Sequence, residues 1–189
     1  MTNNIIIAIV VLAVIYIWYI VIVRKRNQVM ESLSGIDVQL TKRYDLIPNI
    51  LKIAKKFMEH EKNLITEVTS LRARVPNNYQ HNNKDSVAEY FKLNNEIAGK
   101  MSSLLMQVEN YPDLKSNQTM LQAQITYNEV EEHISAARRF YNAAVTELNN
   151  SIQIFPGNLI AKLASAQVMP FYKAEEDKKQ SIDASSLLN

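Results

Sequence analysis

Residues 5–23 constrain this chain more than any other segment, because the run contains no charged, amide or aliphatic hydroxyl side chain. As a helix it would be about 28 Å long at 1.5 Å per residue, close to the hydrocarbon thickness of a bilayer. Lipid offers no hydrogen-bond partner to a backbone, so a single isolated span has to be helical. The sequence therefore predicts one transmembrane helix over 5–23.

The flanks of this run predict its orientation. Residues 1–4 carry no Lys or Arg, whereas Arg24, Lys25 and Arg26 follow the run directly. A cleavable signal peptide has the reverse charge order and a small-residue cleavage site, which is absent here. By the positive-inside rule we expect an uncleaved single-pass anchor in the cell membrane, with residues 1–4 outside and the bulk of the chain cytoplasmic.

Composition favours an all-α chain. Only three Gly and five Pro occur among 189 residues, and Cys is absent, so turn-rich β folds and disulfide frameworks are poorly supported. The redox compartment stays open. The 21 basic and 19 acidic residues give a formal net charge of +2, which is too balanced to indicate a nucleic-acid partner.

A stem continues from the span. Apolar residues recur at spacings of four, three and four, the pattern of an amphipathic helix. Pro48 lacks an N–H and disfavours helix at the residue before it, so we expect a corner over 44–48. The next stripe is in register with the stem, so one kinked helix reaching Val75 is the alternative. The stem positions are Val29, Leu33, Ile36 and Leu40.

Three further apolar stripes follow, over about 50–75, 87–108 and 116–153. Residues 76–84 lack periodicity and are rich in turn formers, which predicts a flexible loop. Ser86 and Glu89 form a capping-box pattern at the next helix start. The stripe positions are Ile50, Ala54, Phe57, Leu64, Val68, Leu71 and Val75; Val87, Phe91, Ala98, Met101, Leu105 and Val108; and Ile134, Tyr141, Val145, Leu148, Ile152 and Phe155.

Four amphipathic stripes predict an antiparallel four-helix bundle with coiled-coil-like packing over 24–172, because each helix must bury its apolar face on a neighbour. We expect residues 173–189 to be a disordered charged tail. The short apolar piece after Pro156 has two alternatives, covering the end of the bundle or lying in the membrane interface; it includes Leu159, Ile160, Leu163, Phe171 and Tyr172.

No catalytic, cofactor or metal site is predicted. His60 and Glu61 begin like a zinc-protease helix, but the second His is missing. Glu61 lies on an apolar stripe, as Arg43 and Asn94 do. We interpret such positions as buried polar pairs that fix helix register, for instance Glu61 with Arg138 or Asn142; the alternative is a general base. We expect Lys52, Lys55, Lys56 and Lys62 to form a solvated helix face.

Several segments together resemble the LemA family, a bacterial group with an N-terminal membrane helix and an all-helical domain. They are residues 36–49 with His60-Glu61, the corner at 111–115, and the block from 134 to 161. The chain departs from the family pattern at 149–151 and 164–166. The resemblance implies a helical bundle tethered to the inner membrane, and it brings no catalytic residues with it.

These observations predict a membrane-anchored scaffold or adaptor that recruits an unidentified protein partner at the inner face of the bilayer, with homo-oligomerisation open. The alternatives are an enzyme acting on a membrane-associated substrate and an envelope-stress sensor. A cleft with clustered carboxylates of perturbed pKa would favour the enzyme, whereas a continuous or complementary groove would favour the scaffold.

Overall fold

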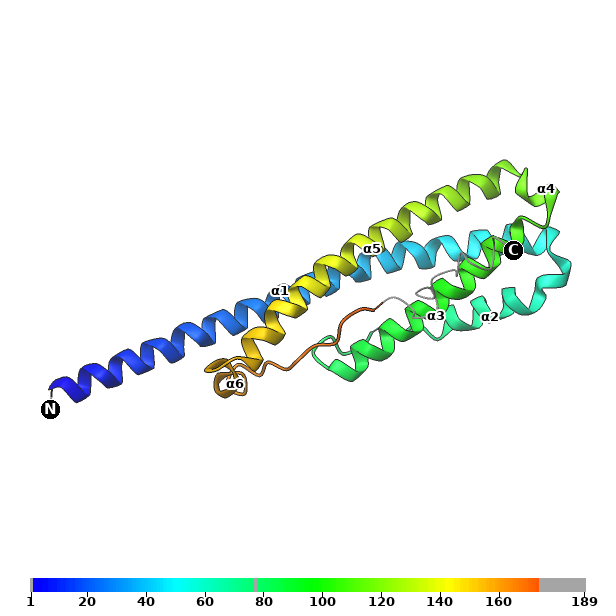
Figure 1. Ribbon diagram of the computed structural model, residues 1–189. Helices are drawn as coiled ribbons and strands as arrows, with labels where there is room; N and C mark the ends of the chain where they lie inside the picture. Colours follow the sequence, from blue (N-terminus) through cyan, green and yellow to red (C-terminus); the bar gives the residue numbers. More distant parts are fainter. Residues whose placement is uncertain (1, 77, 174–189) are drawn as a thin grey trace, which may run out of the picture.

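The computed structural model describes residues 2–76 and 78–173, and this part of the chain is helical without a β-strand. An apolar helix occupies its N-terminus, as predicted. Figure 1 shows a long, narrow molecule in which the first part of α1 extends beyond every other element. The elements are α1 Thr2–Phe57, the 3-10 helix η1 Glu59–Glu61, α2 Lys62–Ala73, α3 Lys84–Val108, α4 Pro112–Lys115, α5 Gln118–Gln153 and α6 Gly157–Ile160.

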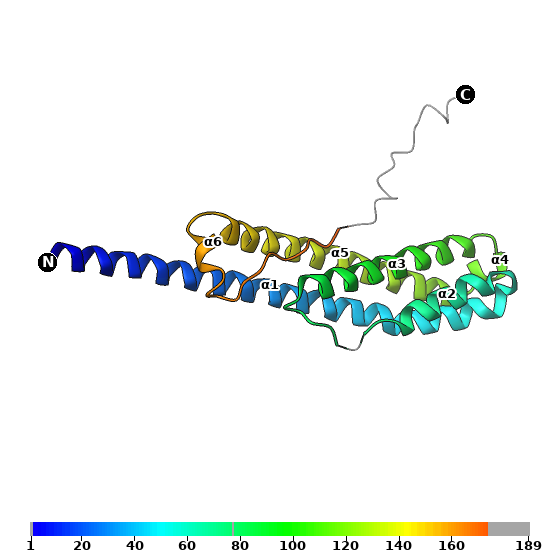
Figure 2. The same ribbon diagram turned by 90° about the horizontal axis from the view of Figure 1, so that it is seen from below.

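Helix α1 has the length and hydropathy to cross a membrane, and its most apolar window is 6% buried. Leu12 is 65% exposed and Ile17 is 58% exposed, whereas Leu33 and Leu40 are 0% exposed. The exposed apolar surface belongs to the part of α1 that stands free in Figure 2. The predicted stem positions are all fully buried.

Helix α1 lies along α5, and α2 lies along α3, in both views. Lys25 of α1 pairs with Glu147 of α5 at 2.6 Å, and Arg43 reaches Glu131 at 3.3 Å. Residue numbers therefore rise along α1 as they fall along α5. Two large apolar clusters fill the space between the helices, one around Leu33, Phe91 and Tyr141 and one around Ile50, Ile97 and Met120.

The predicted corner at residues 44–48 is wrong, because α1 continues through Pro48. Pro48 has no N–H to donate to the carbonyl of Tyr44, four residues earlier. Arg72 of α2 supplies the missing donor, since its Nε donates to the Tyr44 carbonyl at 3.0 Å. A neighbouring helix thus satisfies the group that Pro48 leaves unpaired, and the helix does not have to end there.

The helix ends instead at Phe57, where the backbone of Met58 leaves the helical region at φ −107° and ψ 66°. The alternative of one helix reaching Val75 is therefore wrong too. Met58 is 0% exposed, so its apolar side chain is inserted into the core at the turn. Neither Gly nor Pro marks this position in the sequence.

The start of α3 differs from the predicted capping box. Asn83 is the N-cap, and its side-chain oxygen accepts from the backbone N–H groups of Asp85 and Ser86 at 2.9 and 3.0 Å. The Ser86 hydroxyl instead accepts from the N–H of Gln80 at 3.1 Å. Asn caps helices as well as Ser does, so the helix begins three residues earlier than the Ser86 pattern predicts.

Helix α5 ends at Gln153, close to the predicted end. Phe155, assigned to the buried stripe, lies beyond that end and is 73% exposed. The chain then turns sharply into α6. A Cβ on Gly157 would lie 1.8 Å from the Ser151 carbonyl oxygen, so the turn requires glycine. The predicted tail lies, from residue 174 onward, outside the described residues.

Candidate functional site

The middle of α1 carries three polar side chains that pack against other elements: Arg43, which is fully buried, and Asp37 and Tyr44, which are half-buried. They belong to the segment 36–49 that carries the sequence resemblance. Arg43 and Tyr44 both bind Asn94 of α3, and Asp37 binds the loop before α3, so this segment is the candidate functional site. Its chemistry follows from what each side chain contacts.

Arg43 is fully buried. Its Nη2 donates to the Asn94 side-chain oxygen at 2.5 Å and to the Asn94 carbonyl at 3.2 Å, and its Nη1 donates to Glu131 at 3.3 Å. The Tyr44 hydroxyl also donates to the Asn94 side chain, while Asn94 Nδ2 donates to the Tyr90 carbonyl at 2.9 Å. This cluster joins α1, α3 and α5 by hydrogen bonds.

The charge of Arg43 is compensated inside the protein. Burial alone would lower the pKa of its guanidinium, but Glu131 together with the surrounding Tyr172, Tyr127 and Tyr44 outweighs burial, so the pKa stays above its usual value. Burial raises the pKa of the Tyr44 hydroxyl, which therefore stays protonated and can act as a donor. An arginine held in this way stays charged at all physiological pH values, so it is suited to fixing helix register and not to transferring protons.

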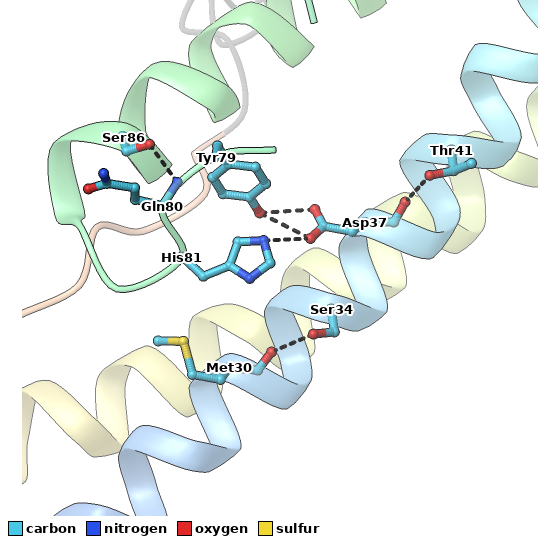
Figure 3. Close-up of polar contacts among 8 residues, drawn as sticks. All are labelled: Met30, Ser34, Asp37, Thr41, Tyr79, Gln80, His81 and Ser86. Carbon is cyan, nitrogen blue, oxygen red and sulfur yellow. Dashed lines mark hydrogen bonds and ion pairs between the residues drawn. The ribbon is translucent and has the colours of Figure 1, made fainter. Parts of the chain in front are cut away.

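The loop between α2 and α3 contacts the Asp37 carboxylate (Figure 3). The Tyr79 hydroxyl donates to its two carboxylate oxygens at 2.9 and 3.2 Å, and His81 Nε2 lies 3.3 Å from the second oxygen. The Tyr79 ring stacks on Tyr90 at 4.0 Å between centroids. The loop predicted to be flexible thus has a defined docking point on α1.

Burial raises the pKa of the Asp37 carboxyl, although Tyr79 and His81 both favour its ionised form. Burial also raises the pKa of Tyr79, and the Asp37 charge adds to that effect. The Ser34 hydroxyl, also drawn in Figure 3, donates to the Met30 carbonyl at 3.0 Å. Among the described residues, the Asp37 carboxylate contacts the side chains of Tyr79 and His81, and no second carboxylate faces it.

A C-terminal strap, residues 166–173, lies along α5 without regular secondary structure. Asn149 accepts from the Met169 N–H at 2.9 Å and donates to the Met169 carbonyl at 3.0 Å. Asn142 holds Tyr172 in the same two-way manner at 2.9 and 3.1 Å. Seven helical residues and three extended residues both span about 10 Å, so the two asparagines match the strap's repeat.

The strap ends beside α3. Tyr172 is 1% exposed, and its ring stacks on Phe91 at 4.0 Å between centroids. Arg138 also contacts this ring, with its guanidinium carbon 4.3 Å from the Tyr172 ring centroid. Asn149 belongs to the stretch 149–151 that departs from the family pattern, and its side chain nevertheless binds the strap at Met169.

The surface of α3 is hollowed on either side of its exposed edge. One groove of about 500 Å³ lies against the 76–80 loop, and a second of about 410 Å³ lies against the strap. Lys92 and Glu96 line both. We name the two together the α3 face. The α3 face carries both positive and negative charges. Arg74 and Glu89 line the groove against the loop, and Phe171 and Lys173 line the groove against the strap.

The three histidines do not come together. His60 in η1 and His133 on α5 are exposed, and His81 faces Asp37. Within the described residues, no group of three His, Asp or Glu side chains could hold a metal ion. Lys52, Lys55, Lys56 and Lys62 are exposed, as expected, but they do not form one helix face, because Lys62 begins α2.

The predicted pairing of Glu61 with Arg138 or Asn142 is wrong. Glu61 lies in η1, beyond the end of α1, and is half-buried. Arg138 stacks on Tyr172 and Asn142 binds the strap. The predicted type of interaction, a buried polar pair between apolar stripes, does occur at Arg43 and Asn94, which bind each other directly.

Sequence reasoning did not find the Asp37 docking point or the asparagine clamps. Asp37 is next to a stripe residue and looks like an ordinary solvated position. The seven-residue spacing of Asn142 and Asn149 was the available signal, because it places two amides on one helix face beside the buried stripe.

Comparison with known proteins identifies the family of the chain. The profile of the LemA family matches residues 32–185, which is most of the chain and begins after the apolar segment of α1. This chain belongs to the LemA family. It is also similar to Protein LemA of Metamycoplasma hominis, at 25% identity over 168 residues that cover 89% of this chain and 74% of that protein.

Proposed function

We propose that this LemA-family protein is a single-pass, membrane-anchored scaffold without catalytic activity. Residues 5–23 cross the membrane, residues 1–4 lie outside, and the helical domain forms an antiparallel four-helix bundle on the cytoplasmic side. The bundle presents the α3 face to a protein partner. The protein therefore binds two things, the bilayer and a protein partner, and it does not bind nucleic acid.

One observation carries the anchored role: α1 passes without interruption from an exposed apolar segment into a fully buried stem. An apolar helix face of this extent is unfavourable in water and suits lipid. Since the same helix is also the core of the domain, the bundle is held at a fixed distance from the membrane surface.

The non-catalytic role rests on how the polar interior is used. Arg43 is bonded to Asn94 and Glu131, and Asp37 is bonded to Tyr79. These contacts join elements of the domain, so Arg43 and Asp37 serve to hold those elements together. The mixed charges of the α3 face, with Lys92 and Glu96 in both grooves, match a protein surface better than a polyanion.

Topology is tested with single cysteines, which the native chain lacks. Asn4 and Asn128 are exposed, and Asn128 serves better than Asn83, whose side chain caps α3. In intact cells an impermeant maleimide should label Asn4→Cys, and it should label Asn128→Cys only after permeabilisation. Labelling of Asn128→Cys in intact cells would reverse the orientation.

The partner surface is tested by placing a photocrosslinking residue at Lys92 on the α3 face or, as a control, at the exposed Glu132 on α5. We expect a discrete protein adduct at Lys92 that is absent at Glu132. An adduct of twice the chain's mass would identify the partner as a second copy. Identical patterns at both positions would contradict a scaffold role for the α3 face.

A further inference from the structure

The corner between α5 and α6, residues 154–164, has two apolar faces. Its inner face packs on α1, where Ile160 and Ala164, at 3% and 4% exposed, form a cluster with the fully buried Ile22. Its outer face is also apolar but uncovered, since Phe155 is 73%, Leu159 66% and Leu163 73% exposed. Covering the end of the core therefore explains only one of the two faces.

The outer face is continuous with the apolar segment of α1. Phe155, Leu159 and Leu163 line a groove of about 420 Å³ whose other wall is formed by α1. The α1 residues in that wall are Val10, Val11, Val14 and Ile15. All of these belong to the proposed span, so the groove lies beside the membrane-crossing segment and not beyond it.

The depth of the corner follows from the length of the span. The hydrocarbon layer requires about 20 helical residues. Twenty helical residues are about 30 Å long at 1.5 Å per residue. The part of the run from Ile5 to Ile15 is about 15 Å long, so it covers only half of the hydrocarbon thickness. The span cannot cross the bilayer unless the residues lining the groove are inside it, and the corner must enter with them.

Polar contacts set the level at which the corner enters. Lys25 pairs with Glu147 at 2.6 Å, and Arg26 Nη1 donates to the Ala164 carbonyl at 3.0 Å. These contacts place residue 164 at the level of the basic cluster that flanks the span. The exposed Lys162 is near the same level, where a lysine side chain can extend to the headgroups.

The backbone of the corner is suited to lipid, where unpaired N–H groups are costly. Gly157 N–H donates to the Ile154 carbonyl at 2.8 Å, and Ala161 N–H donates to the Gly157 carbonyl at 2.8 Å. Leu159 N–H and Ala164 N–H donate within the corner at 3.1 Å each. The close approach at Gly157 holds these turns against the end of α5.

We infer that the α5–α6 corner is a second membrane-embedded element, which enters the leaflet next to Arg24 and takes phospholipid acyl chains against Phe155, Leu159 and Leu163. This inference rests on the proposed anchoring of residues 5–23. The groove between the corner and α1 then holds acyl chain, and the bundle is attached to the membrane at two points.

Tryptophan fluorescence tests this inference, because Trp18 is the single Trp of the chain. In a Trp18→Phe background, Phe155→Trp and Leu159→Trp place one reporter each on the outer face. Phe140→Trp is the matched control, since Phe140 is also 73% exposed and lies on α5. The full chain is reconstituted in nanodiscs of phosphatidylcholine and phosphatidylglycerol, with or without bromine on the phosphatidylcholine acyl chains.

We expect the two corner reporters to emit at shorter wavelength than the Phe140→Trp reporter and to lose most of their emission in brominated nanodiscs. Acrylamide in the buffer should quench the control and spare the corner. Corner reporters that behave like the control, in variants whose helix content is unchanged, would overturn the inference. Native Trp18 separates the two proposals: quenching of Trp18 alone refutes the corner, and no quenching of Trp18 refutes the anchor as well.

Discussion

The two parts of α1 follow opposite rules within one uninterrupted helix. Over 5–23 every side chain is aliphatic or aromatic and most are exposed, with Leu12 at 65%. From Val29 onward the apolar positions recur at every third or fourth residue and are fully buried, while polar side chains occupy most of the positions between them. The first part makes few contacts with other elements. The second part contacts α2, the loop before α3, α3 and α5.

This difference shows that the solvent, and not the helix, sets the pattern of side chains. A helix in lipid is apolar on all sides because its surroundings are, whereas a helix in water needs one apolar stripe and a partner to cover it. The polar groups of the stem, Asp37 and Arg43, could be placed inside only because other elements pair with them. Substitutions that treat the two parts alike should therefore have unlike effects.

The largest expected contrast uses one substitution in both parts. Leu40→Asp places an unpaired charge at a fully buried position and should cost at least about 4 kcal/mol of unfolding free energy. Leu12→Asp should leave thermal unfolding of the domain unchanged and reduce membrane insertion by about 3 kcal/mol. Circular dichroism melts in detergent micelles and membrane fractionation measure the two effects.

The contrast would be broken by equal effects. If Leu12→Asp unfolds the domain as Leu40→Asp does, the apolar part of α1 is packed against protein. If Leu12→Asp leaves both folding and fractionation unchanged, the span assignment is wrong.

A second expected effect concerns the buried guanidinium. Arg43→Ala removes the buried guanidinium that binds both Asn94 and Glu131 and should cost about 3 to 5 kcal/mol of unfolding free energy. Lys42→Ala, one residue earlier and exposed, should cost little. A small effect of Arg43→Ala in chemical denaturation would mean that the cluster contributes no more than an apolar contact would.

The sequence was sufficient for the apolar span, the stem and most helix boundaries, because these depend on hydropathy and on spacing along one chain. It was not sufficient at Pro48, where the outcome depends on Arg72, a residue 24 positions later that lies on another helix. Local propensity identified the missing N–H of Pro48 but led to a corner that does not exist. What it could not supply was the donor that tertiary packing brings to the Tyr44 carbonyl.

A third prediction tests that donor. In the native chain, Arg72→Ala removes the hydrogen bond to the Tyr44 carbonyl and should cost about 1 kcal/mol of unfolding free energy. Pro48→Ala restores an intrahelical donor, so Arg72→Ala should cost clearly less in that background. A double-mutant cycle from urea unfolding measures the coupling between the two positions. Additive effects would mean that Arg72 contributes through another contact.

The smallest expected effect is a pH dependence at the Asp37 docking point. Because burial raises the pKa of Asp37, the folded state binds this proton more tightly than the unfolded state does. The contribution of Asp37 to stability is therefore largest below about pH 4 and is lost as the pH rises through the raised pKa. Asp37→Asn should remove this loss.

The measurement compares melting temperatures across the acid range in a His81→Asn background, so that the imidazole facing Asp37 does not titrate. Tyr79→Phe should make the loss extend to higher pH, because the Tyr79 hydroxyl lowers the Asp37 pKa. Parallel curves with and without the Asp37→Asn substitution would contradict the raised pKa.

The candidate site was less accessible from sequence than the helices were. Arg43 and Asn94 were recognisable as polar residues on apolar stripes, and they do pair. Asp37, Tyr79 and the strap could not be paired in advance, because their contacts join a helix to segments without periodicity. In such segments the backbone conformation determines which side chain reaches a partner, and no spacing rule applies.

The continuity of α1 also has a mechanical consequence. Residues 24–57 form one continuous arm of about 50 Å at 1.5 Å per residue, and the hydrogen bond from Arg72 removes the weak point at Pro48. A change of about 20° in the tilt of the span, which lies within the usual range, would move the far end by about 17 Å. On the proposed membrane placement, a small reorientation of residues 5–23 would therefore produce a large displacement at the far end of α1.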